Sequence, residues 1–219
     1  MKKKSKNSRY PFAKRMIPVV PLIILSLLIS SCLSIDAKFN IASDGSGVLD
    51  LHYEVSQYAA HVGRVDGDQN LVMFPLERSD FEEASMRIGG LEIVEYSKKE
   101  TEDNTIIDVR IRFDSIENVS RLFSTQDIRE PMTIEQDGQR RKLRFFLYQG
   151  SAEAPSQDLV TLYTNLFKGD AIKISCTFPS SISSVSSGQI LADRKSALLL
   201  VPVMDTVIKT EPLVWEIVY

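Results

Sequence analysis

The feature of the sequence that most constrains the fold is a strict alternation of apolar and polar residues that begins at Leu33. Every second residue from Leu33 to Ile41 is apolar, and the alternation resumes from Leu49 to Val55 after the turn segment 43–47 (SDGSG). A period of two places alternate side chains on opposite faces of a strand. Two such runs joined by a short Gly-containing turn predict an antiparallel hairpin.

Further strand patterns follow. Segments 91–96 and 105–113 predict a second hairpin around the polar connection 97–104. Segments 132–136 and 142–148 predict a third, which turns at Asp137-Gly138. The rest of the chain is strand-like over 171–178, 196–203 and 213–219, and the Ser-rich segment 179–188 between them is expected to be a flexible loop.

Helix signals separate the strand pairs. Ser79 and Glu82 match a capping box, and Gly89-Gly90 supply the end of that helix. A short helix is expected from Ser115, and a third after Pro155-Ser156 that ends at Gly169. Hairpins separated by about three helices predict an α+β fold with a mainly antiparallel sheet, formed by a single domain over residues 32–219.

The first 31 residues differ from the rest. They hold seven of the 26 Lys and Arg residues and no acidic residue, and they contain the apolar run 16–30. This layout is typical of a secretory signal peptide. A membrane-spanning helix usually needs about 20 apolar residues, and the run also contains Pro18 and Pro21. We therefore predict a signal peptide over residues 1–31.

The signal-like segment ends in Ile29-Ser30-Ser31-Cys32. This tetrapeptide resembles the bacterial lipobox, which implies that Cys32 receives a diacylglycerol group with acyl chains such as palmitate. The resemblance also implies cleavage before Cys32 and frequent acylation of the new amino terminus. Two or three acyl chains anchor stably, since each buried methylene contributes about 0.8 kcal/mol. A plain cleaved signal peptide and an uncleaved anchor are the alternatives.

Charge limits the partners of the mature chain. Without residues 1–31, 19 basic and 29 acidic residues remain, a net charge near −10. This charge disfavours nonspecific binding to nucleic acid and broad adhesion to anionic lipid. We expect membrane contact through the lipid on Cys32, a lipid or another envelope protein as partner, no nucleic-acid partner and no cofactor.

Cys176 is the second of two cysteines. If Cys32 is lipidated, Cys176 has no partner for an internal disulfide. It shares a strand face with Ile172, Ile174 and Phe178, which predicts a buried, inert side chain rather than a nucleophile.

Several short motifs together resemble a known family. They are the strand directly after the lipobox, the Asp44-Gly45-Ser46-Gly47 turn, Phe178-Pro179 followed by Gly188, and a closing strand with Trp215. The set is similar to bacterial lipoproteins with an LppM-like domain. The resemblance implies an envelope lipoprotein of α+β fold, lipid or glycolipid binding in a few members, and no agreed catalytic site. Some members end in a transmembrane helix, whereas this sequence ends at Tyr219 in a strand pattern.

One acidic segment has a metal-like spacing. Asp66, Asp68, Asn70 and Glu77 occupy positions 1, 3, 5 and 12 of a calcium loop. Leu71 stands where the sharp turn normally requires glycine, and Pro75 stiffens the exit. We therefore treat the four residues as weak metal candidates and favour an acidic surface loop.

Two other polar groups are candidate sites. Asp50, His52 and Glu54 share a strand face, and a metal-dependent or hydrolytic envelope enzyme that uses them, with Asp66 and Asp68, is the alternative function. A solvated strand face explains the same pattern.

The basic run Arg140, Arg141, Lys142 and Arg144 is a candidate site for an anion or a phospholipid head group. Ion pairs with neighbours such as Glu135 and Asp137 are the alternative.

The sequence thus predicts a lipid-anchored bacterial envelope protein on the extracytoplasmic side that acts by binding rather than by catalysis. Lipid or glycolipid is one candidate ligand. Because the strand pattern starts at Leu33, directly after Cys32, we expect almost no tether between the lipid and the domain. Lipid carriage would require the sheet to enclose an apolar cavity.

Overall fold

The alternating segments form two β-sheets in a computed structural model, which describes residues 33–57, 75–124, 130–138, 140–150 and 154–219. Ser31–Tyr219 form one compact unit. The large sheet has the strand order β3-β4-β2-β1-β7-β10-β9, and the small sheet has the order β5-β6-β11-β8. Neighbouring strands are antiparallel except for β1 and β7, so the fold is α+β with mainly antiparallel sheets, as predicted.

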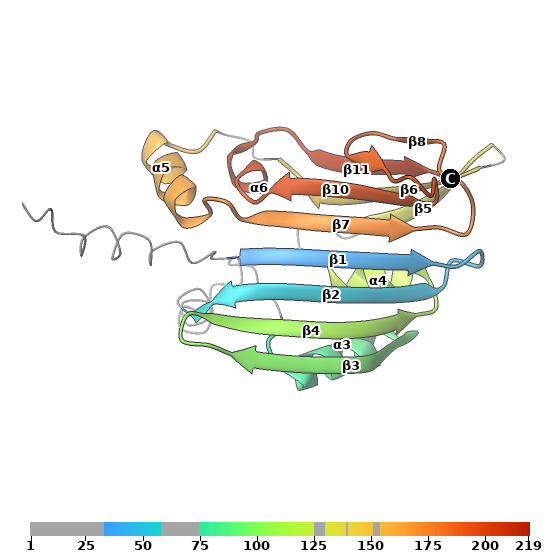
Figure 1. Ribbon diagram of the computed structural model, residues 1–219, viewed down its shortest axis with the longest axis horizontal. Helices are drawn as coiled ribbons and strands as arrows, with labels where there is room; N and C mark the ends of the chain where they lie inside the picture. The colour runs from blue at the N-terminus through green and yellow to red at the C-terminus, as the bar shows by residue number, and fades with distance from the viewer. Residues whose placement is uncertain (1–32, 58–74, 125–129, 139, 151–153) are drawn as a thin grey trace, which may run out of the picture. The chain divides into compact units, whose positions relative to one another are not determined.

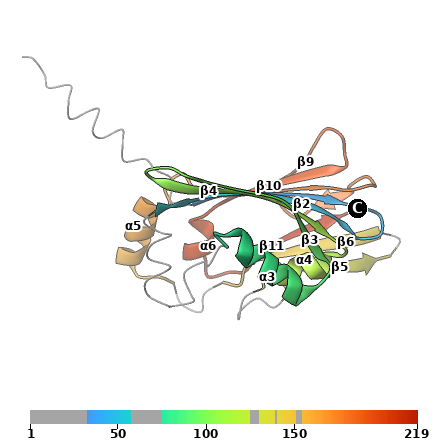
Figure 2. The same cartoon turned by 90° about the horizontal axis from the view of Figure 1, so that it is seen from below.

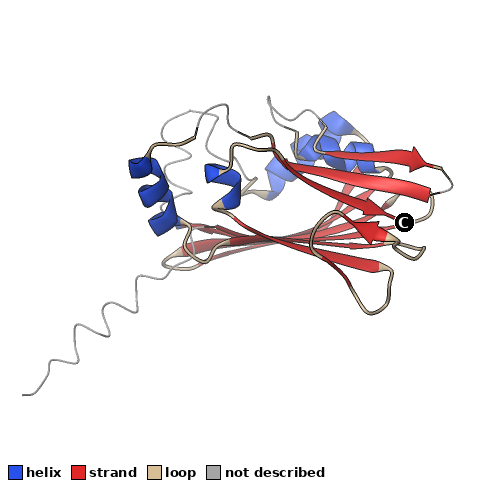
Figure 3. Ribbon diagram, turned by 90° about the horizontal axis from the view of Figure 1, so that it is seen from above, coloured by secondary structure: helices blue, strands red, loops and turns tan. Residues whose placement is uncertain are grey.

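Figure 1 shows the strands of the large sheet side by side. They are β1 (Leu33–Ile41), β2 (Gly47–Ser56), β3 (Leu91–Glu100), β4 (Asn104–Phe113), β7 (Ala171–Thr177), β9 (Gln189–Ile190) and β10 (Ser196–Pro202). The small sheet contains β5 (Met132–Asp137), β6 (Arg140–Tyr148), β8 (Ser184–Val185) and β11 (Leu213–Val218). The small sheet and the helices lie on one side of the large sheet (Figure 2), and the opposite face carries no second layer in the described part of the chain (Figure 3).

The three predicted hairpins are confirmed, with one change at the second. β3 continues through residues that we expected in the polar connection, and the turn contains only residues 101–103. Because β3 is the edge strand of the sheet, its polar side chains can remain in water while its backbone pairs with β4. Lys98, for example, pairs with Glu77 and Glu100.

The described helices are α3 (Arg78–Ile88), α4 (Ile116–Leu122), α5 (Gln157–Leu166) and the four-residue α6 (Asp205–Ile208). Ser115 and Ser156 cap α4 and α5 with their side chains, as the sequence predicts. The predicted cap of α3 is wrong. Its capping box joins Glu77 and Asp80 rather than Ser79 and Glu82, because the helix begins at Arg78 and Ser79 therefore already lies inside its first turn.

The Ser-rich segment is more ordered than expected. It contains β8, and Ile182 within it is buried. Trp215 Nε1 donates a hydrogen bond to the Ser187 carbonyl, at 2.8 Å. Gly188 follows with a φ of 75°, and a Cβ there would collide with the Leu198 carbonyl oxygen, so the turn requires glycine. The amino-acid composition of this segment alone did not indicate an ordered turn that depends on contact with Trp215.

Aromatic side chains join the two sheets. Phe39 on β1 contacts Phe145 on β6, with ring centroids 5.4 Å apart, and Phe145 contacts Trp215 on β11, at 5.5 Å. Phe178 stacks on Tyr219 at 4.0 Å. Cys176 is fully buried in this core, as predicted, and burial raises the pKa of its thiol.

We expect Trp215→Ala to lower the free energy of unfolding by about 3–5 kcal/mol, because it removes a fully buried ring between the sheets. Trp215 is the one tryptophan of the chain, so urea unfolding must be followed by far-UV circular dichroism rather than by tryptophan fluorescence. The control is Leu200→Ala on the outer face, where the side chain is 62% exposed and a change within about 0.5 kcal/mol is expected. Equal effects of the two substitutions would contradict this packing.

Candidate functional site

An apolar cavity of about 370 Å³ lies between the large sheet and the small sheet. This volume is within the range of about 300–1,000 Å³ that is typical of ligand pockets. Among the described residues that line it, Thr206 is the one polar residue and none has a titratable side chain. The lining residues are Leu33, Ile35, Ala37, Phe39, Leu51, Phe123, Pro131, Met132, Phe145, Phe146, Leu147, Phe167, Ile172, Ile174, Val203 and Thr206.

The apolar face of β1 forms one wall of the cavity. Its residues Leu33, Ile35, Ala37 and Phe39 all line the space, because alternation points them to the same side. Parallel pairing with β7 sets Ile35 beside Ile172 and Ala37 beside Ile174. Antiparallel pairing with β2 sets Leu51 on the other side of Ala37. The alternation found in the sequence therefore produces a continuous apolar wall.

The remaining walls come from segments far away in the sequence. Met132 on β5 and Phe145 on β6 belong to the small sheet, whereas Phe123 ends α4. Phe167 ends α5, and Thr206 lies in α6. Figure 1 shows α5 and α6 at the end of the sheets where β1 begins.

The cavity is closed at one end and partly open at the other. Phe39 and Phe145, at the end of the lining farthest along β1 from Leu33, are buried and in contact. Leu33, Ile35 and Phe123 are only partly buried although they are apolar. An arrangement of this kind can hold an apolar chain, since dry apolar cavities bind apolar ligands. Its described lining offers no titratable acid or base to a reacting group, and its one hydroxyl is that of Thr206.

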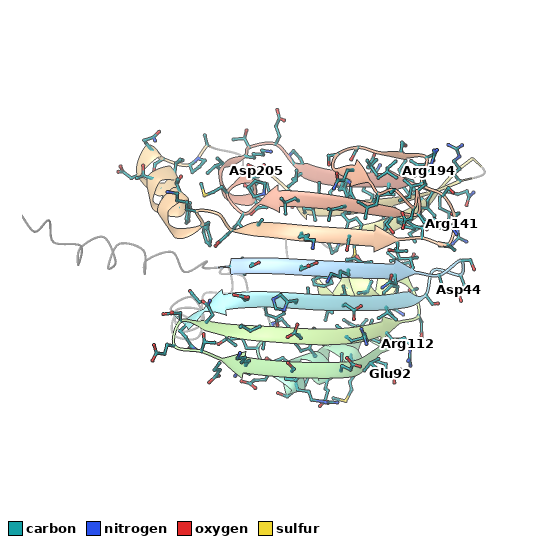
Figure 4. All side chains as sticks on the ribbon, viewed as in Figure 1. Asp44, Glu92, Arg112, Arg141, Arg194 and Asp205 are labelled. Atoms are coloured by element: carbon teal, nitrogen blue, oxygen red, sulfur yellow. The ribbon has the colours of Figure 1, made fainter. Side chains whose placement is uncertain are left out.

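The face of the large sheet that points away from the cavity is polar and carries a second hollow, of about 520 Å³. Asp36, Asp50, His52 and Asp108 are among its lining residues. Charged side chains pair across neighbouring strands of this face, as with Glu92 on β3 and Arg112 on β4 (Figure 4). The candidate residues Asp50, His52 and Glu54 belong to this charged face rather than to the cavity.

The predicted trio does not form one cluster: His52 lies near Asp108 and Glu54, whereas Asp50 pairs with Arg110. His52 Nδ1 lies 2.7 Å from Asp108 Oδ1, and His52 Nε2 lies 3.7 Å from Glu54 Oε1. Asp50 accepts a hydrogen bond of 2.6 Å from Arg110 Nε, which raises the pKa of the Arg110 guanidinium. Among the described residues, no group of three or more His, Cys, Asp or Glu side chains is arranged to hold a metal ion.

Of the calcium-like residues, Asp66, Asp68 and Asn70 lie outside the described residues. Glu77 is described and has a structural role. It forms the capping box of α3 and its Oε1 lies 2.7 Å from Lys98 Nζ. Cys32 also lies outside the described residues.

The basic run is divided by the alternation of β6. Arg144 pairs with Glu135 and Glu216, at 3.4 and 2.8 Å. Arg141 instead donates to the Ser43 carbonyl, at 2.8 Å, beside the Asp44 turn (Figure 4). Hydrogen bonds from Ser46 lower the pKa of Asp44 in that turn. Arg140 and Lys142 alternate with Arg141 along the strand, so the four basic residues do not share one face of β6. A head-group site at this basic run stays a prediction.

Sequence reasoning did not find the cavity itself. Period two identified the apolar face of each strand, but the pairing of β1 with β7 joins residues about 137 positions apart. The one local signal is the group of aromatic residues at 145, 146 and 167, which the sequence pattern alone does not distinguish from ordinary core packing.

No protein-family model matches the chain, and no curated protein does. Among solved structures, the chain is similar to the folded domain of LppM from Mycobacterium tuberculosis, determined by NMR. The TM-score is 0.44 and the sequence identity is 10%, over 86% of this chain and 89% of that chain.

None of the helices in the described ranges combines the length and the apolar character that a membrane crossing requires.

The geometry predicts that the domain binds an apolar fluorescent probe such as N-phenyl-1-naphthylamine. Ile35→Trp should weaken the probe's binding by about tenfold or more, because a larger ring fills the cavity, and tenfold corresponds to about 1.4 kcal/mol. Ser34→Trp is the matched control, since Ser34 precedes Ile35 on the same strand and does not line the cavity. Fluorescence titration measures both. Equal affinities for the two variants would show that the probe binds elsewhere.

Proposed function

We propose that this chain is a lipid-anchored protein of the bacterial envelope whose domain binds the acyl part of a lipid or glycolipid between its two sheets. The observation that carries the proposal is the apolar lining of the cavity, in which Thr206 is the only polar residue among those that the structure describes. An acyl chain needs such a lining, because transfer of its surface from water contributes about 25 cal/mol per Å² and requires no hydrogen-bond partner.

The position of the cavity supports the same proposal. Leu33, the first residue after the proposed lipidated cysteine, is itself part of the lining. A domain anchored through Cys32 would hold the open end of its cavity near the membrane, because one residue spans only about 3.3–3.6 Å. A lipid could then pass from the bilayer to the cavity over a short distance.

Binding rather than catalysis is also part of the proposal. The cavity offers no titratable group. On the other face, the alternative enzyme would need Asp50, His52 and Glu54 to act together. His52 lies near both Glu54 and Asp108, but Asp50 is engaged by Arg110. These pairings support a charged surface in which neighbouring strands neutralise one another.

Native mass spectrometry tests the proposed ligand. The domain that begins at Leu33 is secreted behind a plain cleavable signal peptide and purified from an envelope extract. We expect a retained mass in the lipid range with the unchanged domain and with Ser34→Trp, and its loss with Ile35→Trp. A retained metal ion would favour the enzyme, and a retained protein without lipid would favour an interaction module; either result would contradict lipid binding.

The anchor has its own test. Cys32→Ala in the full chain should abolish metabolic labelling by a radioactive fatty acid, since the thiol is the proposed attachment atom. Cys176→Ala is the control, because that thiol is buried in the core and should not be the labelled group. Labelling that persists in Cys32→Ala would refute lipidation at this residue.

A further inference from the structure

A buried carboxylate holds the first described residue of the chain. Asp170 lies between α5 and β7 and is only 3% exposed. Its Oδ2 accepts a hydrogen bond of 2.8 Å from the backbone N–H of Leu33, which begins β1. The backbone of Asp170 is fixed as well, since its carbonyl accepts from Val203 N at 3.0 Å. The side chain is therefore held in place rather than free to turn to solvent.

The other oxygen of this carboxylate has no partner. Asp170 Oδ1 is buried, and no hydrogen-bond donor reaches it in the described part of the chain. No ion pair between described residues includes Asp170 either. A buried carboxylate with half of its acceptors empty is costly, so such an oxygen is normally paired with a donor or a cation.

The residue that precedes Leu33 supplies a nitrogen within covalent reach of this carboxylate. The Cys32 nitrogen is three bonds from the Leu33 nitrogen, so the two lie within about 4 Å of each other. Cleavage before Cys32 turns that nitrogen into a primary ammonium. The carbonyl end of α5, whose last turn contains no basic residue, precedes Asp170 and also favours a cation. Figure 1 shows α5 at the end of the domain where β1 begins.

We infer that Asp170 is the receptor for the amino terminus that cleavage before Cys32 creates: Oδ2 holds the Leu33 N–H and Oδ1 binds the Cys32 ammonium. The inference rests on the cleavage that is part of the proposed function. A peptidase of the envelope would hydrolyse the Ser31–Cys32 peptide bond. Water supplies the hydroxyl group of the new Ser31 carboxyl and a hydrogen of the new amine, which binds a further proton at neutral pH.

This contact would couple processing to the stability of the domain. Before cleavage the Cys32 nitrogen is a neutral amide. After cleavage it carries a positive charge, which would give the Asp170 carboxylate the cationic partner that it lacks among the described residues. Acylation of the amine would remove the charge again. The ion pair also fixes the point at which the lipid leaves the domain, next to the Leu33 edge of the cavity.

The test compares the full chain before and after a single cut. A site for a sequence-specific protease replaces residues 26–31, and Cys32→Ser prevents lipidation, so that cutting frees an amine at position 32. Urea unfolding in detergent is measured at pH 7. We expect cutting to raise the folding constant by about tenfold or more, the effect of one pKa unit for the amine. Asp170→Asn should abolish this gain.

Two controls separate the contact from other effects of cutting. Asp205→Asn, which changes an aspartate that pairs with Lys209 on α6, should keep the gain. A second variant carries one additional serine between the protease site and position 32, so that the same cut leaves the ammonium one residue farther from Leu33; it should lose most of the gain even if Asp170→Asn does not fold.

An equal gain in Asp170→Asn, an equal gain with the additional serine, or no gain at all would overturn the inference. Titration of the same samples with the apolar probe distinguishes the two proposals. If the probe binds normally but cutting does not raise the folding constant, only the role of Asp170 is refuted and the proposed lipid binding still stands.

Discussion

The structure depends on the apolar face that β1 turns toward the small sheet. At its far end Phe39 contacts Phe145, which in turn contacts Trp215, so the two sheets are packed without a gap there. At the near end Leu33 and Ile35 face a space that no side chain fills. One strand face therefore serves two purposes, because the same alternation that seals the core at Phe39 lines the cavity at Leu33.

The side chains on the two faces of the large sheet are stabilised by different interactions. On the inner face, apolar residues of β1, β2 and β7 are stabilised by removal from water. On the outer face, charges pair with opposite charges on adjacent strands, as Arg110 does with Asp50 and Lys173 with Asp36. Such exposed pairs contribute little stability individually, but they keep an open sheet face soluble. This division is why we place function on the inner face.

Local patterns were sufficient for most of the secondary structure. The hairpins at residues 33–56 and 132–148 and the caps at Ser115 and Ser156 follow from period and turn chemistry alone. The predictions failed where contact with a residue far away in the sequence determines the local structure. The Ser-rich turn depends on Trp215, and the cavity depends on pairing between β1 and β7. Likewise, nothing local to Asp170 indicates that it binds the backbone of Leu33.

The most direct measurement is photo-crosslinking of the full chain in membranes with a fatty acid that carries a diazirine near its methyl end, followed by peptide mapping. A ligand held between the sheets should crosslink to residues of both walls, such as Met132 and Phe167 opposite Ile35. Crosslinks confined to the outer face, for example at the exposed Leu200, would contradict an acyl-binding cavity.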